Sequence, residues 1–456
     1  MLAAGEAVAR LIAFGTTIYL ARTLGASAYG IIGFAAGITL YLTRIADSGI
    51  EYFGLGIREI AEDPRRLPTL VPGITIVRIA VALGLLGVLA IVASVAPRPE
   101  TAVLALYGLT LVTLAANTRW VLLGLEKAAP VAVSRIVGEG IFAAFVLITI
   151  RSSADLLNAP LAQFAGDAAA ALLVAGVVWR SGANVRMELH FAAVRPVFAR
   201  SWRLVLSALL GLVIYNSDLI LLRFFRDTAS VGYYAASYTF ISFLLNLGAT
   251  YNQSLLPALT RGTSGNPADS SLYQAALAHT FALSVPVAIG GFLLAAGLVD
   301  VTFGKAYAPA AIALSILVWS LPLSLMREVA TAGLMSRKGE SSVLRFTLWS
   351  AVANLTLNLI LIRPFGIVGA ALATVATEAI RFTAALFLAR GLGYTPLALR
   401  RLAKPAVSAL LMGAVVSIVG NHVLAGLVAG VFSYLAALTV LGGISWRRGS
   451  LPALKL

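Results

Sequence analysis

Long apolar runs constrain this chain more than any other feature of its sequence. A transmembrane helix needs about 20 predominantly apolar residues, and the 456 residues contain fourteen runs of roughly that length. The runs lie at about 1–20, 28–48, 71–96, 102–123, 130–150, 155–179, 204–222, 230–257, 275–299, 308–335, 341–362, 366–389, 405–420 and 423–446. The sequence therefore predicts an all-α polytopic membrane protein with about fourteen transmembrane helices.

The composition agrees with that fold class and excludes several functions. Charged residues make up 12% of the chain, whereas a soluble domain carries about 25%. The 34 Lys and Arg residues outnumber the 19 Asp and Glu residues. They are spread over many short loops, which is typical of a topology signal and not of a nucleic-acid site. The chain has no cysteine, so disulfides and thiol chemistry are excluded.

The distribution of Lys and Arg predicts the orientation of the spans. With the N-terminus in the cytoplasm, the inside loops and the C-terminus hold 19 of these residues and the outside loops hold 7. Cytoplasmic loops of membrane proteins carry the excess of positive charge. We therefore expect a multi-pass protein of the cytoplasmic (inner) membrane, with both termini in the cytoplasm.

Two pairs of similar stretches indicate an internal repeat. TLGASAYGIIGFAAGITLYL (23–42) resembles FFRDTASVGYYAASYTFISFL (224–244), and RWVLLGLEKAAPVAVSR (119–135) resembles REVATAGLMSRKGESSVLR (327–345). Six spans separate the members of each pair, so the halves share one orientation and the substrate path is expected between them. The predicted domains are an N-terminal six-helix lobe (1–180), a cytoplasmic linker (181–203), a C-terminal six-helix lobe (204–390) and two appended helices (391–456).

Six stretches in order along the chain resemble a known family. They are LARTLGASAYGIIGFA (20–35), DSGIEYFGLGIREIAED (47–63), RWVLLGLEK (119–127), VGYYAASYTF (231–240), FGKAYAPAAIALSIL (303–317) and NLTLNLILIRPFGIVGAALATVATE (354–378). Together they resemble the polysaccharide-biosynthesis or oligosaccharide flippases (Wzx-like) of the multidrug/oligosaccharidyl-lipid/polysaccharide exporter superfamily.

This resemblance implies two six-helix lobes around a central cavity and a protein that is not an enzyme. The usual substrate is an oligosaccharide on a polyprenyl diphosphate, which moves from the cytoplasmic to the outer leaflet by alternating access. The implied partners are this lipid-linked oligosaccharide, membrane lipids and polysaccharide assembly proteins. Members of the family often carry several more residues before the first span, so residue 1 need not be the natural N-terminus.

Charged side chains inside the spans are the candidates for substrate binding. An arginine at mid-bilayer costs about 2.5–3.5 kcal/mol on insertion scales. Four in-span arginines have an acidic residue one turn away, which would partly neutralise them. These pairs are Glu6–Arg10, Arg44–Asp47, Arg135–Glu139 and Glu378–Arg381. One alternative is that such arginines pair within the protein or extend to the inner interface, without any contact to substrate.

A diphosphate headgroup favours arginines in the cytoplasmic half, because a guanidinium group stays charged and makes two parallel hydrogen bonds to phosphate. We expect Arg10, Arg44 and Arg78 to supply positive potential to a cavity that opens to the cytoplasm. Glu6 and Asp47 would orient their partners, whereas Arg78 has no acidic partner in its own helix. The candidates for sugar contacts in the second lobe are Tyr234, Tyr238 and Asn252. The alternative for the tyrosines is packing between helices.

A second candidate site concerns the driving force. No phosphate-binding loop for ATP appears, so an ion gradient is the expected source of energy. Asp218, Asn354, Asn358 and Thr374 fall within about 6 Å of depth in the outer half of their spans, at 1.5 Å per residue. Carboxylate, amide and hydroxyl oxygens suit Na⁺, and the set resembles the sodium site of related lipid flippases. The alternatives are hydrogen bonds between helices and a proton carried by Asp218 or Glu378. No cofactor is expected, and no metal other than Na⁺.

Two other functions stay open. A cation-coupled drug or small-molecule antiporter of the same superfamily would share the fold but would need an acidic and aromatic cavity. A membrane-embedded glycosyltransferase or polymerase would need a substantial outer loop with paired carboxylates, and the outer loops here are short and poor in Asp and Glu. The three histidines, at positions 190, 279 and 422, have no metal-ligand spacing.

Overall fold

The computed structural model describes residues 2–52, 54–180, 191–260, 267–337, 339–395, 397–420, 422–445 and 453–454. The chain divides into two compact units, Met1–Gly232 and Tyr233–Leu456. The two lobes and the linker expected from the sequence stay a prediction, and residues 181–190 of that linker lie outside the described residues.

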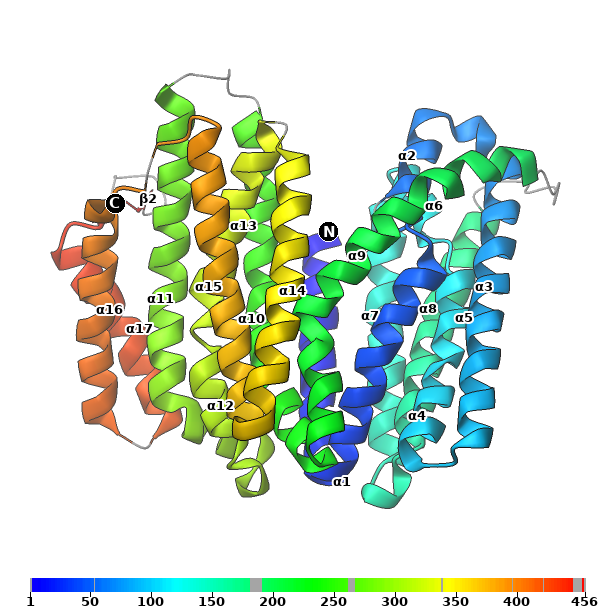
Figure 1. The fold of residues 1–456 in the computed structure, drawn as a ribbon, viewed down its shortest axis with the longest axis horizontal. Coiled ribbons are helices and arrows are strands. Elements are labelled where there is room, and N and C mark those ends of the chain that lie inside the picture. Colours follow the sequence, from blue (N-terminus) through cyan, green and yellow to red (C-terminus); the bar gives the residue numbers. More distant parts are fainter. Residues whose placement is uncertain are drawn as a thin grey trace. The chain divides into compact units, whose positions relative to one another are not determined.

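Helices make up the first unit (Figure 1). They are α1 (Leu2–Asp47), α2 (Leu55–Glu62), η1 (Pro64–Arg66), α3 (Leu67–Val95), α4 (Pro99–Tyr107), α5 (Leu109–Ala116), α6 (Arg119–Gly124), α7 (Ala128–Thr149), η2 (Ser153–Asp155), α8 (Asn158–Arg180) and α9 (Phe191–Phe225). The first residues of α10 (Thr228–Thr260) also belong to this unit, and the rest of α10 belongs to the second.

The second unit continues from α10 and is also almost entirely helical. It contains α11 (Pro267–Phe303), η3 (Lys305–Tyr307), α12 (Ala310–Leu317), α13 (Ser320–Ser336), α14 (Glu340–Phe365), α15 (Ile367–Gly391), α16 (Leu399–Val419), α17 (Val423–Val440), β1 (Ile444–Ser445) and β2 (Ala453–Leu454). The two strands of two residues each pair antiparallel near the C-terminus.

The helices match the spans expected from the sequence. Twelve described helical segments are long and apolar enough to cross a membrane. The first of them, Gly5–Asp47, holds two expected spans in one run, and α10 covers the span expected over 230–257. The chain is therefore a multi-pass membrane protein, and the all-α fold class is confirmed.

Glycines allow α1 to bend in its middle and to pack closely against the start of α10. Gly25 divides α1 with a φ of 76°, a left-handed value that favours glycine. Further along, a Cβ on Gly30 would lie 1.8 Å from the Thr228 oxygen, and a Cβ on Gly232 would lie 1.9 Å from the Ala26 oxygen. Gly30 and Gly232 occupy matching places in the repeated stretches, so the repeat supplies both sides of this close helix crossing.

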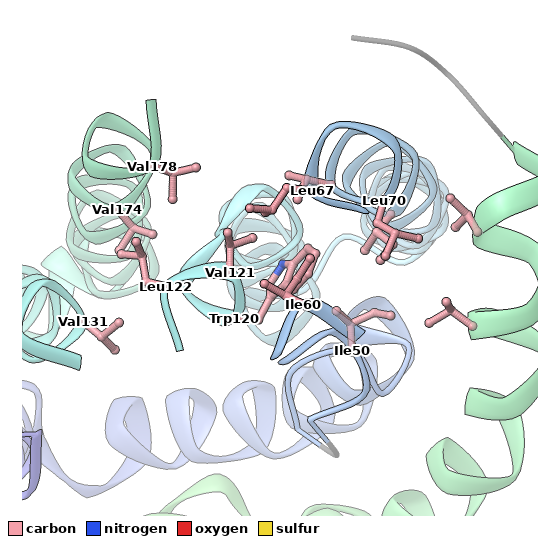
Figure 2. Close-up of a cluster of buried hydrophobic side chains, with 14 residues drawn as sticks. Ile50, Ile60, Leu67, Leu70, Trp120, Val121, Leu122, Val131, Val174 and Val178 are labelled. Atoms are coloured by element: carbon pink, nitrogen blue, oxygen red, sulfur yellow. The ribbon is translucent and has the colours of Figure 1, made fainter. Parts of the chain in front are cut away.

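Each unit has its own apolar core. In the first unit, the fully buried Trp120 of α6 packs in a cluster with Ile50, Ile60 and Leu70 (Figure 2). In the second unit, a separate cluster joins Tyr273 of α11 to residues of α13, α14 and α15. These cores fix the helices that carry the charged side chains.

Candidate functional site

A buried ion pair in the first unit joins α1 to α3. Arg78 is fully buried, and its Nη2 lies 3.2 Å from Oδ1 of Asp47. The Arg78 guanidinium also donates to the carbonyl oxygens of Leu114 and Asn117, at 2.9 and 3.3 Å. Arg78 therefore holds α3 against the end of α1 and the turn before α6, and it exposes no surface to a cavity.

The expected pairing of Asp47 with Arg44 is wrong. α1 ends at Asp47, where its carboxylate accepts hydrogen bonds from the backbone N–H groups of Glu51 and Tyr52 and faces α3. Arg44 instead lies over the ring of Tyr52, with 3.7 Å from its Cζ to the ring centroid. The expectation that Arg78 has no acidic partner in its own helix is confirmed, because its partner Asp47 comes from another helix. Arg44 stays partly exposed, and no carboxylate lies within 4.0 Å of it in the described residues.

A second charged group in the first unit is partly exposed. Glu6 and Arg10 of α1 form the expected pair, at 3.9 Å, and Glu6 also lies 3.6 Å from Arg135 of α7. Arg135 in turn lies 3.7 Å from Glu139. The side chains of Glu6, Arg10 and Arg135 are 31–35% exposed. The close approach of Gly5 to Ala132 brings the two helices together here.

We call Glu6, Arg10, Arg135 and Glu139 the α1/α7 charge group. Its N–O separations exceed the 2.7–3.2 Å of a good N–H···O hydrogen bond, so its ion pairs are loose. The sequence suggested Arg135 as a partner for Glu139 but not for Glu6. The sequence did contain a signal for the contact between Glu6 and Arg135. Both lie beside small residues, Gly5 and Ala132, which allow α1 and α7 to pack closely.

The polar residues expected to bind Na⁺ in the second unit, Asn354, Asn358 and Thr374, are buried and make hydrogen bonds. Asn354 donates to Thr377 at 3.2 Å, and Asn358 donates to Asn354 at 3.1 Å. The Tyr234 hydroxyl lies 3.2 Å from that of Thr374. These bonds connect α10, α14 and α15, an arrangement that serves helix packing and also gathers oxygen atoms.

Of the residues expected to contact sugar in the second unit, two tyrosines are described. Tyr234 is fully buried, and its ring stacks on that of Tyr238 with 6.1 Å between the centroids. The side chain of Asn252 lies outside those described. Tyr234 therefore contributes to packing in this structure, while the sugar-binding roles of all three stay predictions.

Glu378 lies between two arginines in the second unit. Nε of Arg327 donates to Glu378 at 2.9 Å, and Arg381 forms the expected ion pair one turn away. The side chains of Glu378, Arg327 and Arg381 are 2–7% exposed. We call these three residues the α13/α15 charge group. Arg327, from another helix, was not expected as a partner of Glu378.

Asp218 belongs to α9 in the first unit and is 2% exposed. Its Oδ1 accepts a hydrogen bond from the backbone N–H of Leu219 at 3.0 Å. The other expected sodium ligands belong to the second unit, so the complete set of Asp218, Asn354, Asn358 and Thr374 stays a prediction.

Comparison with known proteins decides the family. The family model described as polysaccharide biosynthesis protein matches residues 1–263, which is more than half of the chain. The chain belongs to this family. It is also 25% identical over 192 residues to the probable low-salt glycan biosynthesis flippase Agl15 of Haloferax volcanii. That match covers 42% of this chain and 41% of the relative.

The fold of this polysaccharide biosynthesis protein occurs in solved transporters. The lipid II flippase MurJ, in an inward closed conformation, matches with a TM-score of 0.76 and 13% identity, over 96% of this chain and 98% of MurJ. An inward-facing multidrug resistance MATE transporter matches with a TM-score of 0.64 and 14% identity, over 85% and 96% of the two chains. The expected superfamily fold is confirmed, and the named relatives are flippases and transporters, not enzymes.

Proposed function

We propose that this protein is a flippase that moves an oligosaccharide on a polyprenyl diphosphate across the cytoplasmic (inner) membrane by alternating access. Two relatives support the class, because their names describe a glycan biosynthesis flippase and a lipid II flippase. In this proposal both termini lie in the cytoplasm. The partners are the lipid-linked oligosaccharide, membrane lipids and polysaccharide assembly proteins.

The accessible arginines of the α1/α7 charge group carry the proposal. Arg10 and Arg135 keep about a third of their side-chain surface exposed and hold Glu6 at 3.6–3.9 Å. An exposed ion pair contributes about 0–1 kcal/mol, so exchange of a carboxylate for a phosphate costs little. Hydrogen bonds to charged groups contribute about 1.5–3 kcal/mol, and a guanidinium can make two of them to one phosphate.

The charge balance favours an anionic headgroup over a cationic drug. The α1/α7 charge group has two arginines for two glutamates, and each glutamate already lies near Arg135. Arg44 adds a partly exposed positive charge with no carboxylate within 4.0 Å in the described residues. An antiporter for cations would need unneutralised acidic groups in its cavity, so we rank that function second.

The proposed energy source is an ion gradient, with Na⁺ bound by Asp218, Asn354, Asn358 and Thr374. Their carboxylate, amide and hydroxyl oxygens suit a hard cation. Glu378 is not retained as a proton carrier in this proposal, because Arg327 and Arg381 already neutralise it inside the second unit.

Flipping in proteoliposomes tests the function. The parent protein should move a fluorescent polyprenyl-diphosphate sugar between leaflets, and Arg10→Ala with Arg135→Ala should abolish this movement while insertion and protein level stay near normal. Arg65→Ala is the matched control, since Arg65 is an exposed arginine of η1 in an inner loop. No flipping by the parent would reject the function, and normal flipping by the double variant would reject the role of the arginines.

A further inference from the structure

An apolar groove runs along the second unit between α11, α13, α15 and the start of α16. The cavity has a volume of about 800 Å³ and is lined mainly by carbon atoms. Its walls include Phe281, Trp319, Phe382 and Phe387, and Phe387 is 72% exposed. Figure 1 shows α11 and α16 side by side in this unit, and these two helices are in contact. None of the residues of the proposed substrate or sodium sites lines the groove.

The groove has the depth of one membrane leaflet. Along α11 it extends from Tyr273 to Val285, which is about 18 Å at 1.5 Å per residue. One leaflet of the hydrocarbon core is about 15 Å thick. Arg390 and Leu399 line one end of the groove. This is the end that the charge distribution predicts for the cytoplasmic interface, because Arg390 lies in the last turn of α15 and Arg400 and Arg401 lie in the first turn of α16.

Three arginines lie in or next to the segments that line that cytoplasmic end. Arg390 lines the groove, and Arg400 and Arg401 lie between the lining residues Leu399 and Leu402. Among the described residues, no carboxylate lies within 4.0 Å of these three arginines. The chain from residue 379 to 456 contains eight Lys and Arg residues and no Asp or Glu. The protein therefore supplies no counter-charge from this part of its sequence.

From this combination we propose that the groove binds an anionic phospholipid of the inner leaflet. The acyl chain fills the apolar groove, and the phosphate lies among Arg390, Arg400 and Arg401. Basic pockets between transmembrane helices on the cytoplasmic side recognise anionic headgroups in this way, and guanidinium groups bind phosphate bidentately. The apolar groove beside the exposed Arg390 distinguishes such a site from general attraction to the membrane surface.

Native mass spectrometry of the full, delipidated protein tests this site. The parent protein should retain one phosphatidylglycerol molecule more tightly than phosphatidylcholine of the same chain length. The triple variant Arg390→Gln, Arg400→Gln and Arg401→Gln should lose this preference. Each arginine should contribute about fivefold to the affinity for phosphatidylglycerol, which corresponds to about 1 kcal/mol per arginine near an anionic lipid. Thr383→Trp, at an exposed lining position, should weaken retention of both lipids.

Matched variants make the test decisive. Arg65→Gln removes an exposed inner arginine outside the groove, and Ile418→Trp adds an indole at an 85% exposed site outside it; neither should change lipid retention. Equal retention of the two lipids by the parent, or retention that the triple variant leaves unchanged, would overturn the proposal. Displacement of phosphatidylglycerol by farnesyl phosphate at equal concentration would also overturn it and assign the groove to a prenyl chain. The measurement involves no transport, so its outcome is independent of the flippase activity.

Discussion

Each unit contains a glutamate between two arginines, and the two groups differ in burial. In the second unit, Glu378 holds Arg327 at 2.9 Å and pairs with Arg381, and all three side chains are 2–7% exposed. In the first unit, Glu6 lies 3.9 Å from Arg10 and 3.6 Å from Arg135, and these side chains are 31–35% exposed. The same residue types therefore form one tight, buried group and one loose, partly exposed group.

This difference separates a structural role from a binding role. Charges removed from water are stable only while every partner stays in place, so the α13/α15 charge group holds its helices together. The ion pairs of the α1/α7 charge group are loose and partly exposed, and such pairs contribute little to stability, so these arginines can exchange a carboxylate for a ligand. Burial, and not the presence of arginine in a span, distinguishes the two cases.

The largest expected effect comes from removal of the buried glutamate. Glu378→Gln leaves Arg327 and Arg381 without their shared carboxylate, and loss of one partner from a buried ion pair costs about 3–5 kcal/mol. Thermal unfolding in detergent should therefore occur at a much lower temperature, or the protein should fail to accumulate. Glu6→Gln is the matched control and should change the unfolding free energy by about 0–1 kcal/mol. If the two substitutions lowered the unfolding free energy equally, the difference in burial between the two charge groups would have no effect on stability.

A smaller but still large effect is expected at Arg78, which lies in the first unit but is fully buried. Arg78→Gln should destabilise the protein by about 3 kcal/mol, at the lower end for a broken buried pair, because Asp47 keeps the backbone N–H groups of Glu51 and Tyr52 as donors. The double variant with Asp47→Asn should regain part of the loss. If Arg78→Gln unfolded at the same temperature as the parent, burial would not determine the free-energy cost of breaking the ion pair.

The smallest expected effect concerns Na⁺. At about ten times its dissociation constant, a bound ion stabilises the folded state by about 1.4 kcal/mol. The parent should therefore unfold at a higher temperature with Na⁺ than with choline at fixed pH, and Asp218→Asn should lose this response. An equal Na⁺ response in both proteins, or none in the parent, would reject the sodium site.

The sequence was sufficient to predict partners within one helix but not between helices. Residues three or four positions apart share a helix face, so Glu6–Arg10 and Glu378–Arg381 could be paired from spacing. The same rule fails for Arg44 and Asp47, because α1 ends there and Asp47 faces α3. Arg78 and Arg327 find partners 31 and 51 positions away, and such contacts depend on helix packing that spacing does not encode. The fourteen spans, by contrast, follow from hydrophobic length, which the bilayer sets directly.

The central claim is that Arg10 and Arg135, the partly exposed arginines of the α1/α7 charge group, bind the diphosphate of the substrate. Calorimetric titration of the detergent-solubilised protein with farnesyl diphosphate, a soluble stand-in for the carrier, tests it most directly. We expect Arg10→Ala with Arg135→Ala to raise Kd at least about tenfold, the equivalent of one charged hydrogen bond of about 1.4 kcal/mol. Arg10→Lys should also bind farnesyl diphosphate more weakly than the parent, since lysine lacks the planar guanidinium group that makes two parallel hydrogen bonds to phosphate. The control variant Arg65→Ala should bind like the parent. An unchanged Kd in the Arg10→Ala and Arg135→Ala double variant would contradict the account.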